Sequence, residues 1–145
     1  MKIVLQRVTY GSVTVKDEIV GEIGQGLVLL VGITQADDLK KADFLAEKCL
    51  SLRIFEDDAG KMNLSLLDIK GELLVISQFT LYGDTRKGRR PSFVDAAPPE
   101  FSEPLYNYFV ELLKKSSLKI ETGIFGASMQ VKIHNDGPVT FVLES

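Results

Sequence analysis

Short runs of apolar, β-forming residues separated by polar turns dominate residues 2–34 of the chain. The alternation of Ile3, Leu5 and, less regularly, Val8 predicts a strand that begins near the first residue. The same criteria predict further short strands over residues 12–15, 19–23 and 27–31. The last of these is apolar at every position, which is typical of a strand buried on both faces.

Two segments carry apolar residues at the spacing of an α-helix. The first is predicted to start at the capping residues Asp37 and Asp38 and to bury one stripe of side chains. That stripe consists of Leu39, Ala42, Leu45, Ala46, Cys49 and Leu52. The second helix is predicted to begin at an N-cap Ser102, after a non-helical linker over residues 95–100 that contains the Pro98-Pro99 pair. Its buried face is expected to consist of Leu105, Phe109, Leu112 and Leu113.

The rest of the apolar pattern predicts more short strands and, with them, the fold class. These strands are expected over residues 53–55, 62–67, 73–81, 118–121, 129–133 and 139–143. Many short strands around two main helices indicate a single α+β domain that spans residues 1–145. We expect its antiparallel and mixed sheets to curl into a barrel-like core.

One predicted strand changes from apolar to polar along its length. Leu73–Ile76 is a continuous apolar run, and Ser77, Gln78 and Thr80 follow it with Phe79 interleaved. Polar side chains are costly to bury unless they find hydrogen-bond partners. The pattern therefore predicts that this strand ends at a functional site.

A short cationic loop follows the polar residues. Arg86, Lys87, Arg89 and Arg90 lie within five positions around Gly88. Such a loop beside a pocket suits a phosphate-bearing partner, although a solvated turn remains an alternative. Because the net charge is −3, any RNA contact has to come from this local patch, the only dense one in the chain.

Composition excludes several kinds of chemistry. The single cysteine, Cys49, rules out an intrachain disulfide, and together with the single histidine, His134, it cannot build a zinc site of the usual type. His134 alternates out of phase with Val131 and Ile133, so we expect it to face solvent and not to serve as the base of a Ser-His-Asp triad. No apolar run approaches the roughly 18 residues of a membrane span, and we expect no contact with membranes. An enzyme of this composition would work through positioning and backbone hydrogen bonds.

Three segments together resemble the D-aminoacyl-tRNA deacylase family, also known as the D-tyrosyl-tRNA deacylases. They are Ser77–Leu81, Asn135–Thr140 and the loop Thr85–Phe93. The likeness extends from the first strand to the last, and it includes Arg53–Glu56 and Gly60–Asn63. One departure is Gly83, where the family pattern leads us to expect alanine, with a looser strand end and no effect on the site.

The resemblance implies a homodimer with active sites at the subunit interface. It implies that the Gly137–Pro138 peptide bond is cis and projects into the partner's pocket, beside the Ser77-Gln78 strand. The implied substrate is an aminoacyl-tRNA that carries a D-amino acid, or glycine mischarged on tRNA-Ala, on its terminal adenosine. The implied reaction is hydrolysis of that ester in the cytoplasm, with no cofactor and no metal.

The family pattern also assigns roles to individual residues. The catalytic segment is Ser77, Gln78, Phe79 and Thr80, with backbone N–H groups that stabilise the oxyanion. The main-chain carbonyls of Gly137 and Pro138 are expected to accept from the α-ammonium and to exclude L side chains by clash. The remaining assignments are an adenosine pocket with Phe125 and Met129, and phosphate contacts by Arg86, Lys87, Arg89 and Arg90.

Two other interpretations of the site stay open. The first is a binding module that holds RNA ends or nucleotides without chemistry, which Phe79 and the basic loop would allow. The second is a small-ester or peptide hydrolase with Thr80 or Ser77 as its nucleophile, although the sequence around them is not that of a nucleophile elbow.

Overall fold

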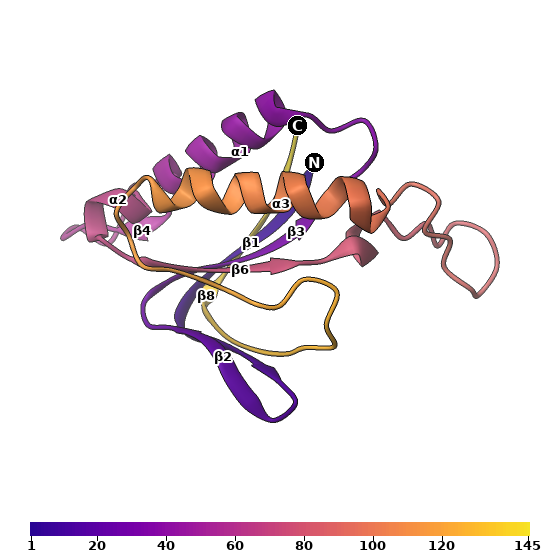
Figure 1. The fold of residues 1–145 in the computed structure, drawn as a ribbon. Helices are drawn as coiled ribbons and strands as arrows, with labels where there is room; N and C mark the ends of the chain where they lie inside the picture. The colour runs from indigo at the N-terminus through magenta and orange to yellow at the C-terminus, as the bar shows by residue number, and fades with distance from the viewer.

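A mixed six-stranded sheet forms the centre of the computed structural model, which describes residues 1–145 (Figure 1). Its order is β2-β1-β3-β6-β7, and β8 pairs with β1. These strands are β1 (Lys2–Val15), β2 (Glu18–Ile23), β3 (Gly26–Gly32), β6 (Glu72–Ser77), β7 (Ile120–Thr122) and β8 (Gln130–Glu144). The β3–β6 and β6–β7 pairs are parallel and the others antiparallel, so the prediction of mixed, curled sheets is confirmed.

The long, bent strand β1 makes the sheet curl into a nearly closed barrel. It pairs with β3 through residues 2–8 and with β2 through residues 11–15, while β8 follows its other edge. Register shifts near Val8 and at Val13/Thr14 accompany the bend, as β-bulges do. The prediction of two separate strands over 3–8 and 12–15 was therefore wrong, because the segment between them continues the pairing with β8.

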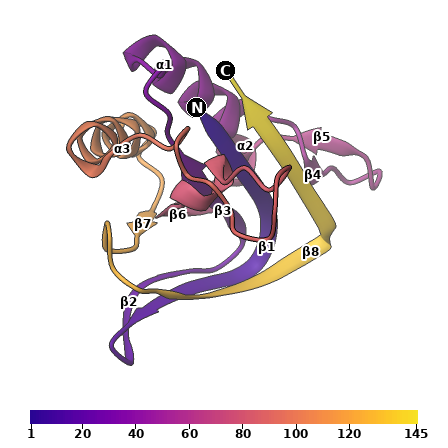
Figure 2. The same ribbon diagram turned by 90° about the vertical axis from the view of Figure 1, so that its right-hand side faces the viewer.

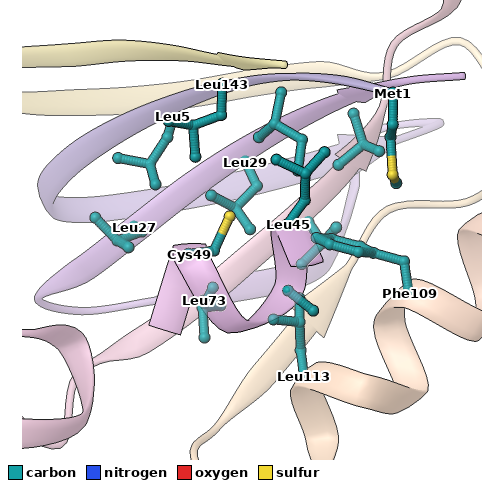
Figure 3. Close-up of a cluster of buried hydrophobic side chains, with 14 of the residues drawn as sticks. Met1, Leu5, Leu27, Leu29, Leu45, Cys49, Leu73, Phe109, Leu113 and Leu143 are labelled. Carbon is teal, nitrogen blue, oxygen red and sulfur yellow. The ribbon is translucent and has the colours of Figure 1, made fainter. Parts of the chain in front are cut away.

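Strands β3 and β6 are buried on both faces, as their continuous apolar runs predicted. Their alternate side chains belong to two clusters, of which the larger packs under the helices and the smaller lies inside the curl of the sheet. Figure 3 shows the larger cluster, where sheet residues such as Leu29 and Leu73 meet Leu45 and Phe109 from the two helices. The smaller cluster consists of Val8, Val13, Ile23, Val28, Leu74 and Ile76.

Two main helices cover one face of the sheet (Figures 1 and 2). Helix α1 (Leu39–Ser51) begins at the N-cap Asp38, whose side chain accepts from the Lys41 N–H. The middle of the predicted stripe, Ala42, Leu45, Ala46 and Cys49, is buried, whereas Leu39 is 54% exposed and Leu52 is a half-buried C-cap. A short helix, α2 (Leu66–Ile69), replaces the end of the strand predicted over 62–67.

Helix α3 (Pro99–Lys114) begins earlier than the sequence indicated. Its N-cap is Pro98, and Ser102 lies within the helix, where its hydroxyl donates to the Pro98 carbonyl at 3.1 Å. The prediction of a non-helical linker through residue 100 was wrong, because proline is favoured at the first helical position, where no N–H is needed. The helix thereby carries Ser102 and Tyr106 to the edge of the site described below.

The remaining elements are small. Strands β4 (Phe55–Glu56) and β5 (Met62–Leu64) form a separate two-stranded sheet, and a 3₁₀ helix, η1, spans Phe79–Tyr82. The chain termini lie side by side, where the Met1 amino group forms a buried ion pair with Asp37. No helix is both long enough and apolar enough to cross a membrane.

Candidate active site

The polar segment after β6 is a turn and not the continuation of a strand. The Gln78 N–H makes the last contact with β3, by donating to the Val31 carbonyl at 2.8 Å. Strand β3 ends at Gly32, so the residues after Gln78 have no neighbouring strand, and Phe79–Tyr82 closes into the 3₁₀ helix. As its first residues, Phe79 and Thr80 have N–H groups without an intrahelical acceptor.

A cavity of about 540 Å³ opens at this turn. Ser77, Gln78 and Phe79 line one side of it, and Phe125 and Met129 from the connection between β7 and β8 line another. The structure thus brings three of the four predicted catalytic residues and both predicted adenosine residues to one place, whereas Thr80 is exposed and does not line the cavity. Twelve of the 17 lining residues are hydrophobic, so the cavity suits a ligand with a flat apolar face.

Tyr106 supports the wall of the cavity and was not expected from the sequence. Its hydroxyl donates to the Val75 carbonyl of β6 at 2.8 Å, and its ring lies tilted on Phe125 with 5.8 Å between centroids. Burial raises the pKa of Tyr106, which keeps the phenol protonated as a donor. The helical spacing of Tyr106 with Phe109 and Leu113 marks it as inward-facing, but nothing local indicates its contact with Phe125.

The hydroxyls at the turn lack the partners of an activated nucleophile. The Gln78 side-chain amide donates to the Thr80 hydroxyl, and no histidine, lysine or carboxylate hydrogen-bonds to Ser77 or Thr80. His134, on β8, is exposed and packs on Tyr10 with 5.1 Å between ring centroids, as its strand phase predicted. The chemistry available here is positioning by backbone donors and by Gln78.

The cationic segment is a closed loop beside the cavity. Asp84 and Ser92 exchange two backbone hydrogen bonds at its base, of 2.7 and 2.9 Å. Arg86 donates to the Asp84 carboxylate through its backbone and its guanidinium, with each distance 2.9 Å. These hydrogen bonds lower the pKa of Asp84 to about 2. The other cations of the loop, Lys87, Arg89 and Arg90, are exposed and form no ion pair.

Gly83 lies next to Phe93, a residue of the cavity wall. A Cβ at this position would lie 3.0 Å from Cε1 of Phe93 and 3.1 Å from the Thr80 carbonyl oxygen. Because Phe93 lines the cavity, a side chain at position 83 would press on a residue of the cavity wall, and the expectation that the site is unaffected stays a prediction. The sequence does not indicate this contact, which depends on closure of the loop between them.

The Gly137–Pro138 turn lies on β8, and neither residue lines the cavity of its own chain. Its peptide bond is cis, as the resemblance implied, and both residues are exposed. Arg7, only 5% exposed, anchors the turn from beneath. Its Nε lies 3.3 Å from the Asp136 carbonyl oxygen and 3.1 Å from the Asp136 carboxylate, and its Nη1 donates to the Ile54 carbonyl at 2.7 Å.

Arg7 is a residue of the site's framework that the sequence analysis missed. A signal was present, because Arg7 continues the inward phase of Ile3 and Leu5 along the first strand. A charged side chain in an inward-facing position needs buried partners. Here those partners are carbonyl groups from two distant segments, at Ile54 and Asp136.

The described side chains offer no group of three or more His, Cys, Asp or Glu residues that could hold a metal ion.

Comparison with known proteins then decides the family. The model of a family described as D-Tyr-tRNA(Tyr) deacylase matches residues 4–144. The chain belongs to this deacylase family.

Relatives of this deacylase family align along the whole chain. The D-aminoacyl-tRNA deacylase of Clostridium botulinum (strain Alaska E43 / Type E3) is 61% identical, over 100% of this chain and 97% of its own length. The D-aminoacyl-tRNA deacylase of Bacillus mycoides (strain KBAB4) is 60% identical, over 100% of this chain and 99% of its own. The family resemblance drawn from the sequence is therefore confirmed.

Solved structures show the same fold as this family member. The c-Myc DNA Unwinding Element Binding Protein superimposes with a TM-score of 0.94 at 48% identity, over 100% of this chain and 99% of that one. A probable eukaryotic D-amino acid tRNA deacylase superimposes with a TM-score of 0.86 at 17% identity, over 98% and 97% of the two chains. The second likeness bears on the fold alone.

Proposed function

We propose that this deacylase family member hydrolyses the ester bond between a D-amino acid and the terminal adenosine of tRNA. One observation carries the proposal: a single apolar cavity joins Ser77–Phe79 to Phe125 and Met129. Its volume of about 540 Å³ lies in the range of small-molecule sites and suits a nucleoside with an attached aminoacyl group. The products are a free D-amino acid and a tRNA ready for recharging, in the cytoplasm where translation takes place.

Backbone groups supply the chemistry in this proposal. The free N–H groups of Phe79 and Thr80 donate to the oxyanion that forms when water attacks the ester carbonyl. One such donor contributes about 2.7–4 kcal/mol of transition-state stabilisation. Gln78 orients the water or the 2′-hydroxyl of the substrate, and Phe125 and Met129 enclose the adenine.

Chirality is selected by a second copy of the chain. Gly137 and Pro138 are exposed and lie outside their own cavity, so they are free to enter the cavity of a partner in a homodimer. Their carbonyl groups then accept from the α-ammonium, which all aminoacyl substrates share. A D side chain points outward in this arrangement, and an L side chain is driven into the backbone. Glycine has no side chain to clash, so glycyl-tRNA is a substrate too.

The cationic loop holds the RNA backbone. Lys87, Arg89 and Arg90 are exposed and unpaired, so they are available for phosphates. Arg86 contributes less in this proposal, because Asp84 occupies its guanidinium.

The experiment that tests the proposal follows ester loss from D-aminoacyl-tRNA, L-aminoacyl-tRNA and glycyl-tRNA, together with a model ester that lacks the tRNA. We expect rapid loss from the D- and glycyl substrates only. A binding module would hydrolyse none of the four, and a general esterase would also cleave the model ester.

Replacement of the two hydroxyls tests the mechanism. Ser77→Ala and Thr80→Ala should each retain substantial activity, because the proposal assigns catalysis to N–H groups. Complete loss of activity in a variant whose circular dichroism is unchanged would instead identify a hydroxyl nucleophile.

A further inference from the structure

The rim of the cavity carries a partly uncovered aromatic pair, Phe79 and Phe93. Both residues line the cavity, yet they remain 59% and 40% exposed. Their rings meet edge to face, with 5.1 Å between centroids. Val94, next in the chain, is 83% exposed and adds a second apolar side chain to the surface at this point of the chain. An apolar patch at the mouth of a pocket, bordered by charged residues, is typical of a ligand-binding surface.

The ring of Phe93 is held in position from several sides. The bare Cα of Gly83 lies beneath it, where a Cβ would come within 3.0 Å of the ring. The edge contact with Phe79 supports it laterally. Its neighbour Ser92 is tied to Asp84 by two backbone hydrogen bonds. A ring fixed in this way loses little conformational freedom when a ligand stacks on it.

Positive charge adjoins this ring. The loop that Asp84 and Ser92 close carries Lys87, Arg89 and Arg90, all exposed and without ion pairs. A fixed aromatic face next to unpaired cations is the combination that single-stranded RNA sites use, with bases on the rings and phosphates on the cations.

We propose that Phe93 is the stacking platform for the base of the penultimate nucleotide in the single-stranded 3′ end of the RNA. This inference rests on the proposed function, which puts the terminal adenosine in the cavity. The preceding nucleotide then leaves through the rim, where Phe93 lies, and its phosphate points to the cationic loop. Gly83 and Phe79 act as positioning residues for the ring.

The test is a binding cycle that does not depend on catalysis. Two fluorescent RNA hexamers are compared, one ending in cytidine-cytidine-adenosine and one with an abasic residue at the penultimate position. For the wild-type protein, removal of that base should weaken binding about 5- to 30-fold, which corresponds to about 1–2 kcal/mol of stacking. Phe93→Leu should bind the two hexamers with equal affinity, and Phe93→Tyr should behave as the wild type does.

Phe44→Leu is the matched control, because Phe44 is a 50% exposed phenylalanine on α1 that does not line the cavity. It should keep the full wild-type preference for the intact hexamer. Equal binding of both hexamers by the wild type overturns the proposal and is the result expected if a second copy of the chain covers Phe93. The same base effect in Phe93→Leu as in the wild type overturns it as well. Hydrolysis of D-aminoacyl-tRNA is measured separately, so failure of the proposed function is distinguished from failure of the platform.

Discussion

At the scale of single residues, Arg7 connects the core to the exposed Gly137–Pro138 turn. Arg7→Met removes the donors to the Ile54 and Asp136 carbonyls. Hydrogen bonds from a charged group are worth about 1.5–3 kcal/mol, so urea unfolding should show a decrease in stability of about that size. Under the proposed function, discrimination between D- and L-aminoacyl-tRNA should fall as well, because the turn no longer has its anchor.

Gln6→Met is the control for this change, since Gln6 is on the same strand and makes only an exposed hydrogen bond to Thr140. This control variant should change the free energy of unfolding little, and it should change the discrimination between D- and L-aminoacyl-tRNA little as well. If Arg7→Met lowers stability and leaves chiral discrimination at the wild-type value, the turn does not select the substrate.

Asp84 provides a prediction for pH. Its pKa is lowered to about 2, chiefly by the side-chain hydrogen bond from Arg86, whereas an unfolded aspartate titrates near 3.9. Since the folded value is the lower one, the pair stabilises the loop above about pH 4, and this contribution disappears as the pH falls toward 2. Carboxyl NMR titration should give a midpoint near 2 for the wild type and a value closer to 3.9 in Arg86→Ala. An unchanged midpoint in the variant would show that Arg86 is not the cause of the lowered pKa of Asp84.

At the scale of elements, the close approach of β3 to β6 depends on Gly26. A Cβ there would lie 1.8 Å from the Glu72 carbonyl oxygen, which belongs to the backbone and cannot move away alone. Gly26→Ala should therefore lower the free energy of unfolding by about 3 kcal/mol or more. Gly24→Ala is the matched control, because its Cβ would meet nothing closer than a Glu72 carboxylate oxygen at 4.0 Å. Similar denaturation midpoints for the two variants would contradict the clash.

The cationic loop allows a test with balanced charge. The double variant Asp84→Asn/Arg86→Gln removes an ion pair without changing the net charge, whereas Arg89→Gln/Arg90→Gln removes two unpaired cations. The slope of log affinity against log salt for tRNA should stay constant in the first variant. In the second it should fall by about 0.7–0.9 for each phosphate that the protein no longer neutralises. Equal slopes in all three proteins would exclude the loop from the RNA interface.

The elements differ in how far their sequence determines them. Strands β3 and β6 were predicted correctly, because burial on both faces leaves a continuous apolar run. The segment after Ser77 alternates as a strand does, and it turns because β3 ends beside it, which is a property of the neighbouring strand. The prediction that Ser102 is the N-cap was wrong for a local reason, since Pro99 already starts the helix.

The residues of the site also differ in how far the sequence alone could predict them. The resemblance assigned Ser77–Thr80 to catalysis and Phe125 and Met129 to the adenosine, and all of these except Thr80 line the cavity. Phe93, Tyr106 and Arg7 act through contacts that are distant in the sequence, so no local pattern identified them. Arg7 left a signal as a charge in an inward-facing strand position, and the helical spacing of Tyr106 marks it as inward-facing without indicating its contact with Phe125.

At the scale of the whole molecule, one chain does not contain a complete site under the proposed function. The cavity and the Gly137–Pro138 turn belong to the same chain but not to the same place. Most homodimers have twofold symmetry, and in such a dimer each copy would lend its turn to the other. Sedimentation should then give twice the chain mass of 16.0 kDa.

Complementation between two inactive variants tests the shared site directly. Phe79→Pro removes one proposed oxyanion donor at a position where helices accept proline. Gly137→Val alters the turn, since Gly137 has a φ of 120° that a β-branched residue does not adopt. Each homodimer should be impaired in D-aminoacyl-tRNA hydrolysis. After the two are unfolded together and refolded, half of the dimers are mixed, and each mixed dimer holds one site with an intact cavity and an intact turn. Activity should therefore recover to about a quarter of the wild-type value. A mixture no more active than its parents, despite mixed dimers seen by mass spectrometry, would mean that each chain catalyses alone.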